Sequence, residues 1–371
     1  MGLPVSYEKK QLNKSRIARF ILREGTTSKP EIASVLKISM PTVLQNIKEL
    51  TEAGVVHEVG EYESTGGRKA KALAIVPDIR YAVGIDITAN HVSFVLIDLK
   101  GSILHWRRNR LSYDHSQAYY QSVRDALALF IRESGADTSK ILGTGISLPG
   151  IIDKSSRTLV KSHILNVENL SLRIFGQYFD REPAYENDAN AAAMAELKCQ
   201  SGNAVYLSLS NTVGGAVYIN QELYPGDHFR SAEFGHMTLI PGGKPCYCGK
   251  QGCVDAYCSA KVLSQQSGDS LEAFFSQLSG GEAKAAAIWD QYLEHLAVTI
   301  ANLRMSFDCD IILGGYVGGF LEPYVMELGQ RTLRYNRFDQ DSSYIRLCRY
   351  AKEASAVGIA LTFVDQFIDH I

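Results

Sequence analysis

Two stretches, VGIDITANHVSFVLIDLKGSIL at residues 83–104 and VYLSLSNTVGGAVYINQELY at residues 205–224, share one pattern. Each starts with two runs of strand-forming residues around a polar turn, and a second tight turn leads into a third run. We expect strands at Tyr81–Thr88, His91–Asp98, Ser102–Arg110, Ala204–Leu209, Gly215–Asn220 and Gln221–Tyr224. This internal repeat predicts two α/β subdomains that face each other across a cleft, and such clefts are common ligand sites.

The rest of this body alternates helices and strands. The sequence predicts helices near Gln117–Glu133, Ala283–Phe307 and Ser355–Ile368, and strands at Ile141–Leu148 and Ile311–Gly315. We therefore divide the body into subdomains at 78–200 and 201–371, and expect the C-terminal helix to rejoin the first of them.

Residues 1–77 have the pattern of a winged helix-turn-helix domain (α+β). Ser28 and Glu31 have capping-box spacing, and Ser39 can cap a third helix that runs from about Pro41 to Ala53. We expect the inward face of that helix to consist of Val43, Leu44, Ile47 and Leu50. Side chains on its other faces are free to reach phosphates or base edges, and the candidate DNA contacts are Ser39, Thr42, Gln45 and Asn46.

A hairpin follows the third helix, with strands predicted at Val55–Glu61 and Lys69–Ile75. Its tip contains two glycines followed by Arg68 and Lys69, which suits a DNA-contacting wing because it offers little bulk and two cations. Residues 1–80 carry 13 Lys and Arg against 9 Asp and Glu, a net charge of +4, so the remainder carries −6. A basic head on an acidic body favours DNA as the partner, and the alternative is a packing domain that docks a partner protein.

Composition sets wider bounds on the class of protein. The chain has 371 residues, of which 46% are hydrophobic and 21% charged, as in ordinary globular proteins. No apolar run reaches the 18 residues of a membrane span, and the N-terminus lacks the hydrophobic core of a signal peptide. Seven cysteines, an odd number, fit a reducing cytoplasm, where we expect the protein to act.

A compact group of metal-binding residue types lies between residues 235 and 253, in GHMTLIPGGKPCYCGKQGC. His236, Cys246, Cys248 and Cys253 supply one imidazole and three thiols, which is ligand chemistry for tetrahedral zinc. All four positions are filled by protein side chains, so we expect a structural rather than a hydrolytic zinc. The alternative is a set of incidental buried cysteines, which close spacing in an intracellular chain makes less favourable.

These motifs together resemble the ROK family (repressor, open reading frame, kinase) over nearly the whole chain. The resemblance rests on the zinc loop and on three further segments, Ser147–Asp153 (SLPGIID), Glu186–Ala193 (ENDANAAA) and Ile311–Gly315 (IILGG). The fused winged helix-turn-helix is similar to the sugar-responsive repressor branch. The resemblance implies a duplicated actin-like, ribonuclease-H-like ATPase fold, a sugar site in the cleft and a homodimer or homotetramer.

The resemblance also implies a set of sugar contacts by position. Asp188 matches the catalytic base of the family's kinases, and its neighbour Asn187 belongs to the same motif. Asp255 stands where the family usually has Glu, and Asn166 lies in an altered segment. The candidate sugar contacts, for a monosaccharide or an amino sugar, are therefore Asn187, Asp188, Glu233, His236, Asp255 and Asn166.

The two turns that hold ATP phosphates in family kinases depart from the family pattern. Thr88–His91 replaces a glycine-rich turn, and Ser210–Gly215 retains only its last two glycines. Phosphate cradles need closely approaching backbone N–H groups, often at backbone angles that only glycine adopts cheaply. We therefore do not expect ATP and Mg²⁺ as cofactors. The sequence favours a sugar-responsive DNA-binding repressor, with an active ATP-dependent sugar kinase using Asp188 as the alternative.

Overall fold

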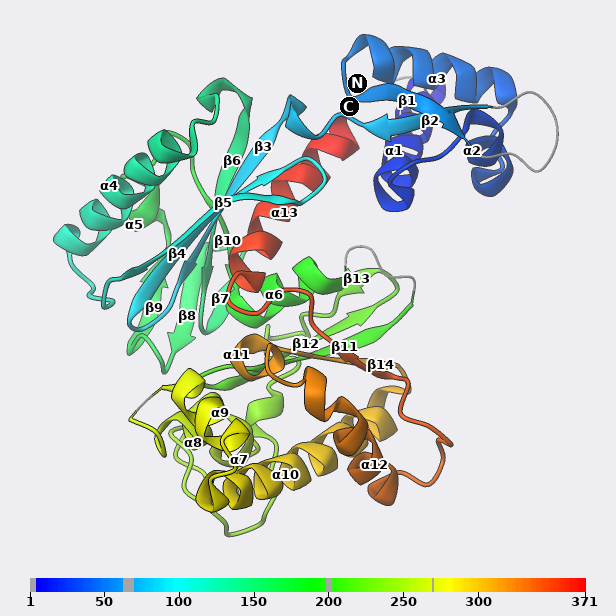
Figure 1. Ribbon diagram of the computed structural model, residues 1–371. Helices are drawn as coiled ribbons and strands as arrows, with labels where there is room; N and C mark the ends of the chain where they lie inside the picture. The colour runs from blue at the N-terminus through cyan, green and yellow to red at the C-terminus, as the bar shows by residue number, and fades with distance from the viewer. Residues whose placement is uncertain (1–4, 63–69, 198–201, 269) are drawn as a thin grey trace.

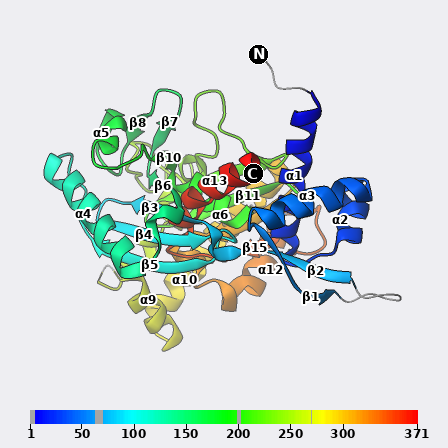
Figure 2. The same cartoon turned by 90° about the horizontal axis from the view of Figure 1, so that it is seen from above.

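The computed structural model describes residues 5–62, 70–197, 202–268 and 270–371 and arranges them as a head and two lobes (Figure 1). The head packs beside the first lobe, next to the end of the C-terminal helix (Figures 1 and 2). The predicted boundary between the two subdomains at residue 200 falls outside the described residues and stays a prediction.

The head is a winged helix-turn-helix. Its elements are α1 (Val5–Glu24), α2 (Lys29–Leu36), α3 (Met40–Glu52), β1 (Val56–Tyr62) and β2 (Ala70–Ile75). The Ser28 hydroxyl accepts a hydrogen bond from the Glu31 backbone N–H at 3.4 Å, as the capping pattern predicts. The Glu31 carboxylate accepts a hydrogen bond from the Thr27 hydroxyl at 2.8 Å.

The first lobe is built on a five-stranded sheet with the order β10-β6-β3-β4-β5. Its strands are β3 (Tyr81–Ile87), β4 (His91–Asp98), β5 (Ile103–Arg110), β6 (Ile141–Leu148) and β10 (Ala184–Asn187). Alternate residues of β3 point to opposite faces. Val83 and Ile85 pack with α4 (Gln117–Ser134), whereas Ala82 packs with α13 (Ala354–His370).

A smaller sheet and two helices complete the first lobe. They are β7 (Ile151–Asp153), β8 (Thr158–Ser162), β9 (Val167–Ser171), α5 (Arg173–Gly176) and α6 (Asp188–Leu197), with 3-10 turns η1 (Pro77–Ile79) and η2 (Thr138–Lys140). The sequence did not predict this small sheet, because its strands have only three to five residues and no long alternating pattern.

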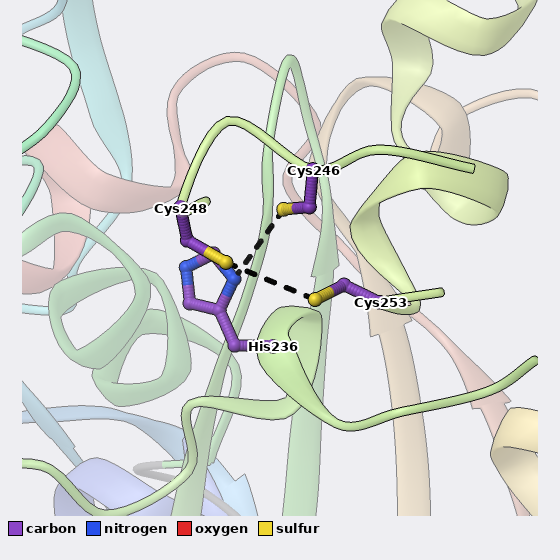
Figure 3. A group of neighbouring side chains, drawn as sticks. All are labelled: His236, Cys246, Cys248 and Cys253. Atoms are coloured by element: carbon purple, nitrogen blue, oxygen red, sulfur yellow. Dashed lines mark hydrogen bonds between the residues drawn. The ribbon is translucent and has the colours of Figure 1, made fainter. Parts of the chain in front are cut away.

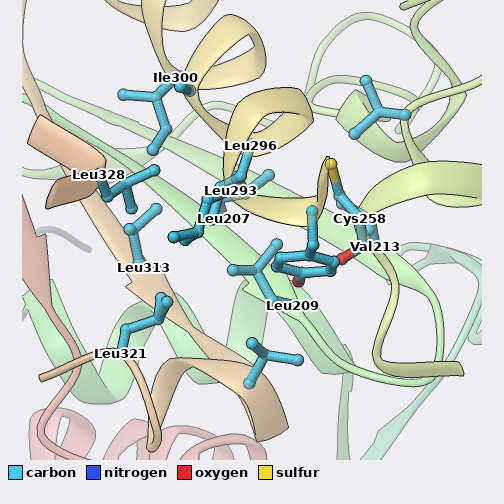
Figure 4. Packing of buried hydrophobic residues seen from close by; sticks show 14 of the residues in the cluster. Leu207, Leu209, Val213, Cys258, Leu293, Leu296, Ile300, Leu313, Leu321 and Leu328 are labelled. Carbon is cyan, nitrogen blue, oxygen red and sulfur yellow. The ribbon is translucent and has the colours of Figure 1, made fainter. Parts of the chain in front are cut away.

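The second lobe repeats the arrangement with the sheet order β13-β12-β11-β14-β15. Its strands are β11 (Ala204–Leu209), β12 (Val213–Ile219), β13 (Glu222–Leu223), β14 (Asp310–Gly314) and β15 (Ile345–Leu347). Its helices are α7 (Asp255–Cys258), α8 (Ala260–Ser264), α9 (Leu271–Ser279), α10 (Ala283–Phe307), α11 (Gly315–Gly318) and α12 (Val325–Tyr335), with 3-10 turns η3 (Phe234–His236) and η4 (Glu322–Tyr324). Leucines of β11, β14, α10 and α12 interlock in its core (Figure 4).

Strand pairing confirms the internal repeat. In the first lobe β3 pairs antiparallel with β4 and parallel with β6, and in the second lobe β11 pairs antiparallel with β12 and parallel with β14. Several expected boundaries differ by one residue, and the start of β12 differs by two, since this strand begins at Val213 rather than Gly215. Val213 pairs with Leu209 and is buried, which extends the strand by two residues.

The C-terminal helix α13 joins parts of the molecule that are far apart in sequence. It packs against both β3 and α6 at very close range. A Cβ atom at Gly358 would lie 1.6 Å from the Ala191 carbonyl oxygen, and one at Gly84 would lie 1.8 Å from the Ala356 carbonyl oxygen. Only glycine fits at these two crossings, so α13, α6 and β3 form one closely packed unit. None of the described helices is both long and apolar enough to cross a membrane.

Candidate functional site

A cavity of about 540 Å³ lies between the two lobes. Its wall includes the segments Pro149–Ile152 and Asn187–Asn190 from the first lobe, and Val213–Gly215, Phe229–Glu233 and Tyr247–Cys248 from the second. This volume is in the usual range for small-molecule sites. The repeat therefore positions a ligand-sized space where the sequence predicts the cleft.

Three carboxylates line this cavity: Asp188, Glu233 and Glu186, the last of which is paired with Lys154. Burial raises the pKa of Asp188 above its usual value, although a hydrogen bond from the Ala189 N–H to its carboxylate at 3.0 Å works in the opposite direction. Desolvation, and next the charge of Asp188, raises the pKa of Glu233. The two groups are thus close enough to interact and are open to a ligand that donates hydrogen bonds.

Asn187 also lines the cavity, and neighbouring backbone fixes its orientation. Its amide donates to the Gly150 carbonyl at 2.9 Å, and its side-chain oxygen accepts from the Asn190 N–H at 3.0 Å. Next to it, buried Glu186 accepts from the Asn190 amide and forms an ion pair with Lys154. This network holds the start of α6, and with it Asp188, in place.

Two of the candidate contacts do not belong to the cavity wall. Asp255 is buried and accepts a hydrogen bond from the Val213 N–H at 2.6 Å, and burial raises its pKa to about 6. Asn166 lies in the turn between β8 and β9 with a positive φ of 53°. Asp255 therefore supports the turn before β12, and direct sugar contacts from Asp255 and Asn166 stay predictions.

His236, Cys246, Cys248 and Cys253 converge, with ligand atoms within 4.8 Å of one another (Figure 3). The His236 Nδ1 lies 3.7 Å from the Cys246 Sγ, and the Sγ atoms of Cys248 and Cys253 lie 3.8 Å apart. Tetrahedral zinc with Zn–S bonds of about 2.3 Å requires sulfur atoms about 3.8 Å apart. The donor set and its spacing therefore fit a structural zinc ion held by four protein ligands.

The backbone of this loop explains its glycines. Gly249 and Gly252 have φ angles of +90° and +78°, which side chains rarely adopt. A Cβ at Gly252 would also lie 1.8 Å from the Ile240 carbonyl oxygen. These two glycines let the loop turn tightly enough to bring Cys248 and Cys253 together.

Backbone N–H groups of the turn Thr88–His91 donate hydrogen bonds within the turn itself. The Thr88 N–H donates to the His91 carbonyl at 2.9 Å, and the His91 N–H donates to the Thr88 hydroxyl at 3.1 Å. A phosphate cradle needs backbone donors that point at the ligand. Here the donors of Thr88 and His91 are occupied within the turn, and the expectation that ATP is not a cofactor stays a prediction.

A contact between the lobes lies near this turn. Arg108 of β5 donates to the Tyr316 hydroxyl of α11 at 3.1 Å, and its guanidinium lies 5.2 Å from the tyrosine ring centroid. Close by, burial and the charge of Asp188 raise the pKa of Asp86 to about 7, while a 2.8 Å hydrogen bond from Ser147 opposes the shift. After the roles expected from the sequence, we call Asn187, Asp188, Glu233 and His236, which line the cavity, the sugar side. We call Thr88–His91, Asp86, Arg108 and Tyr316, which do not belong to the cavity wall, the nucleotide side.

The exposed face of α3 differs from the predicted one at two positions. Asn46 is buried at 1% exposure and its amide donates to the Thr42 carbonyl at 2.8 Å, so the prediction that it faces DNA is wrong. Leu44, expected inside, is 48% exposed. The buried set Val43, Asn46, Ile47 and Leu50 has i, i+3, i+4, i+7 spacing, which places position 46 on the inner stripe and position 44 off it.

The other candidate DNA contacts on or next to α3 are polar residues near the start of this helix. Ser39 is exposed and its hydroxyl lies 2.8 Å from that of Thr42, while Gln45 is exposed and donates to Glu49 at 2.8 Å. Arg68 and Lys69 of the predicted wing lie outside the described residues, and so does most of the hairpin tip.

Comparison with known proteins decides the family. Residues 82–366 match the ROK family, and residues 12–57 match a winged helix-turn-helix DNA-binding domain. The chain belongs to the ROK family.

Two of the curated relatives are named as repressors. The ROK protein described here is 30% identical over 259 residues to the xylose repressor of Bacillus spizizenii, covering 68% of this chain and 67% of the relative. It is 25% identical over 266 residues to the N-acetylglucosamine repressor of Escherichia coli O157:H7, covering 69% of this chain and 64% of the relative.

Solved structures give the same fold for regulators and kinases. A ROK family transcriptional regulator, a homolog of the E. coli MLC protein, superposes with a TM-score of 0.74 at 19% identity, covering 98% of this chain and 97% of that one. A ROK hexokinase from Thermus thermophilus superposes with a TM-score of 0.60 at 25% identity, covering 76% of this chain and 97% of that one. The match to the regulator includes the head, because it spans 98% of this chain, whereas the match to the hexokinase spans 76%.

Several groups in the cavity wall were not predicted from the sequence. They include His163, Arg230, Tyr247 and Lys250. Tyr247 stands between two cysteines of the metal loop, and that position is the one hint that it could face the cavity. His163 lies in the turn between β8 and β9, in the same segment as the candidate contact Asn166, so the sequence singled out the segment but not this residue.

Proposed function

We propose that this protein is a DNA-binding transcriptional regulator, a repressor that leaves its operator when a monosaccharide or an amino sugar enters the cavity. The head supplies the DNA-binding surface, with Ser39, Thr42 and Gln45 on α3 and the predicted wing cations Arg68 and Lys69. The sugar side supplies Asp188 and Glu233, which accept hydrogen bonds from hydroxyl groups. The names of the two repressor relatives support a sugar of this class.

One observation carries the proposal: α13 contacts both the cavity wall and the head. At its start the Ser355 hydroxyl donates to the Asp188 carbonyl at 3.0 Å. At its end Asp365 and Asp369 form ion pairs with Arg19 of α1, and the Ser15 hydroxyl donates to the Asp369 carbonyl at 3.2 Å. A single rigid helix thus links the residue next to the sugar with the first helix of the head.

Packing makes this link more than a pair of polar contacts. Ile17 and Ile21 of α1 belong to one continuous hydrophobic core with Val357, Val364 and Ile368 of α13. A fully buried side chain of this kind contributes about 1.5–3 kcal/mol. The head is therefore packed directly against α13 rather than joined to the body by a linker alone. A shift of α13 would accordingly change the position of α1.

Thermodynamic linkage sets what such a regulator requires. The sugar must bind the DNA-free conformation more tightly than the DNA-bound one, with a typical coupling of about 1–3 kcal/mol. In a homodimer or homotetramer, movement of the heads would change the separation of two recognition helices, whose target spacing on DNA is roughly 34 Å. The oligomer and the zinc ion in the His236 loop are parts of this proposal.

The direct test is titration of DNA fragments from the protein's own locus with and without D-xylose, D-glucose or N-acetyl-D-glucosamine. We expect one fragment to bind in the nanomolar range and to weaken by about 5- to 150-fold with the right sugar. Absence of specific binding to any fragment, in every condition, would contradict the proposal.

The route through α13 has its own test. Ser355→Ala removes the bond to Asp188 while leaving the cavity side chains in place, so sugar and DNA should each still bind. The sugar-induced loss of DNA affinity should shrink several-fold. Ser134→Ala at the end of α4, far from this path, is the matched control and should leave the coupling unchanged.

A sugar kinase remains the second candidate because Asp188 lies in the cavity with a raised pKa, as suits a general base. A coupled ADP-release assay with the same three sugars distinguishes the two functions. We expect no turnover above the background, and no ATP-dependent thermal shift. Turnover that disappears in Asp188→Asn would establish the kinase instead.

A further inference from the structure

Tyr247 lies between two predicted zinc ligands, Cys246 and Cys248, in the sequence, but it is part of the cavity wall. It is 46% exposed. A residue that only shields the metal would be expected to be buried against the sulfur atoms. Its exposure to the cavity indicates a role toward whatever occupies that space.

The Tyr247 hydroxyl is held by His236. The His236 Nε2 lies 3.2 Å from the Tyr247 oxygen, while the Nδ1 of the same ring faces the Cys246 Sγ. When a metal binds through Nδ1, the ring proton resides on Nε2, and the imidazole must donate to the tyrosine oxygen. The tyrosine's own proton is then free to be donated to a ligand oxygen.

The Tyr247 ring also contributes to the contact between the lobes. Its centroid lies 5.2 Å from the His236 ring and 6.0 Å from the ring of His163, which belongs to the first lobe, and both pairs are edge-to-face. Tyr247 and His163 thus place two rings side by side in the cavity wall. Amphipathic aromatic rings suit a ligand that has both hydroxyl groups and apolar C–H faces.

We propose that Tyr247 contacts the sugar and helps to determine which sugar is accepted, with its hydroxyl oriented by His236 and its ring paired with His163. This inference rests on the proposed function and adds a residue to the sugar side. The tyrosine donates a hydrogen bond to one hydroxyl oxygen of the sugar, and the zinc loop fixes the direction of that donor.

Calorimetric titration of Tyr247→Phe with D-xylose, D-glucose and N-acetyl-D-glucosamine tests the proposal. The phenylalanine keeps the ring, so we expect a roughly 3- to 10-fold loss of affinity for the sugar that the wild type binds, from one hydrogen bond. Zinc content and sugar-free DNA affinity should stay at wild-type levels. Tyr224→Phe is the matched control, because Tyr224 is 53% exposed and is not part of the cavity wall.

A second measurement separates contact from structural support. Monodeoxy analogues of the bound sugar each lack one hydroxyl group, and one of them should bind wild type and Tyr247→Phe equally. Equal affinity of wild type and Tyr247→Phe for the parent sugar would overturn the inference and leave the proposed function intact. If the wild type binds none of the three sugars, the proposed function fails as well.

Discussion

On the sugar side of the cleft, Asp188 and Glu233 present carboxylates to a cavity. On the nucleotide side, Arg108 and Tyr316 bind each other across the lobes, and the donors of Thr88 and His91 are used within their own turn. Two acidic side chains of the sugar side thus face the cavity, whereas several groups of the nucleotide side bind one another. The Arg108 Nε is nevertheless buried without a hydrogen-bond partner among the described residues, so the polar groups of the nucleotide side are only partly satisfied.

Removing the buried charge on the nucleotide side should have the largest effect. The pKa of Asp86 is raised from its unfolded value to about 7, so the folded protein binds an extra proton between about pH 4 and pH 7. Its ionisation therefore destabilises the fold as pH rises through this window.

Asp86→Asn should remove that penalty. Relative to wild type, the variant should gain up to about 4 kcal/mol between pH 4 and pH 8, from roughly three pKa units at about 1.4 kcal/mol each. Urea unfolding at pH 5, 6, 7 and 8 measures the difference. A constant difference across the series would show that Asp86 does not titrate in this range.

Disruption of the metal loop tests whether this loop supports the residues of the sugar side. Cys248→Ser, or chelation of the wild type, removes support from His236 and from the neighbouring Tyr247 and should weaken sugar binding by at least 10- to 100-fold. The head should stay folded and keep its DNA affinity, because its hydrophobic core is shared with α13 and includes no residue of the metal loop. Circular dichroism, zinc content and sugar titration together decide this, and full sugar affinity in folded, zinc-free protein would refute it.

Tyr316→Phe should have the smallest effect. It removes the hydrogen bond from Arg108 but keeps the ring under the guanidinium, so about 0.5–1.5 kcal/mol of contact between the lobes is lost. Sugar affinity should change by less than about 10-fold in thermal-shift titrations. A larger loss would show that the nucleotide side takes part in sugar binding directly.

The sequence predicts those parts of the molecule that follow a clear pattern of residues along the chain. The duplicated strands, the helix-turn-helix and the converging His236 loop all follow from repeats, caps and residue types that are local in sequence. The structure confirms that the four predicted zinc ligands converge.

The sequence fails where placement depends on a neighbouring element. Asn46 has a polar side chain but occupies an inner helical position, so tertiary packing overrides its chemistry. Asp255 follows the predicted zinc ligand Cys253 by two residues, yet its carboxylate supports the turn at Val213. His163 reaches the cavity wall from the turn between two short strands that lack a recognisable period.

The central claim is that the cavity and the DNA-binding head are coupled, and reciprocity tests it most directly. Sugar affinity should be measured by titration in free protein and in protein saturated with its operator. We predict that DNA weakens sugar binding by the same factor by which sugar weakens DNA binding, within about 5- to 150-fold. Identical sugar affinity in the two states would contradict the account.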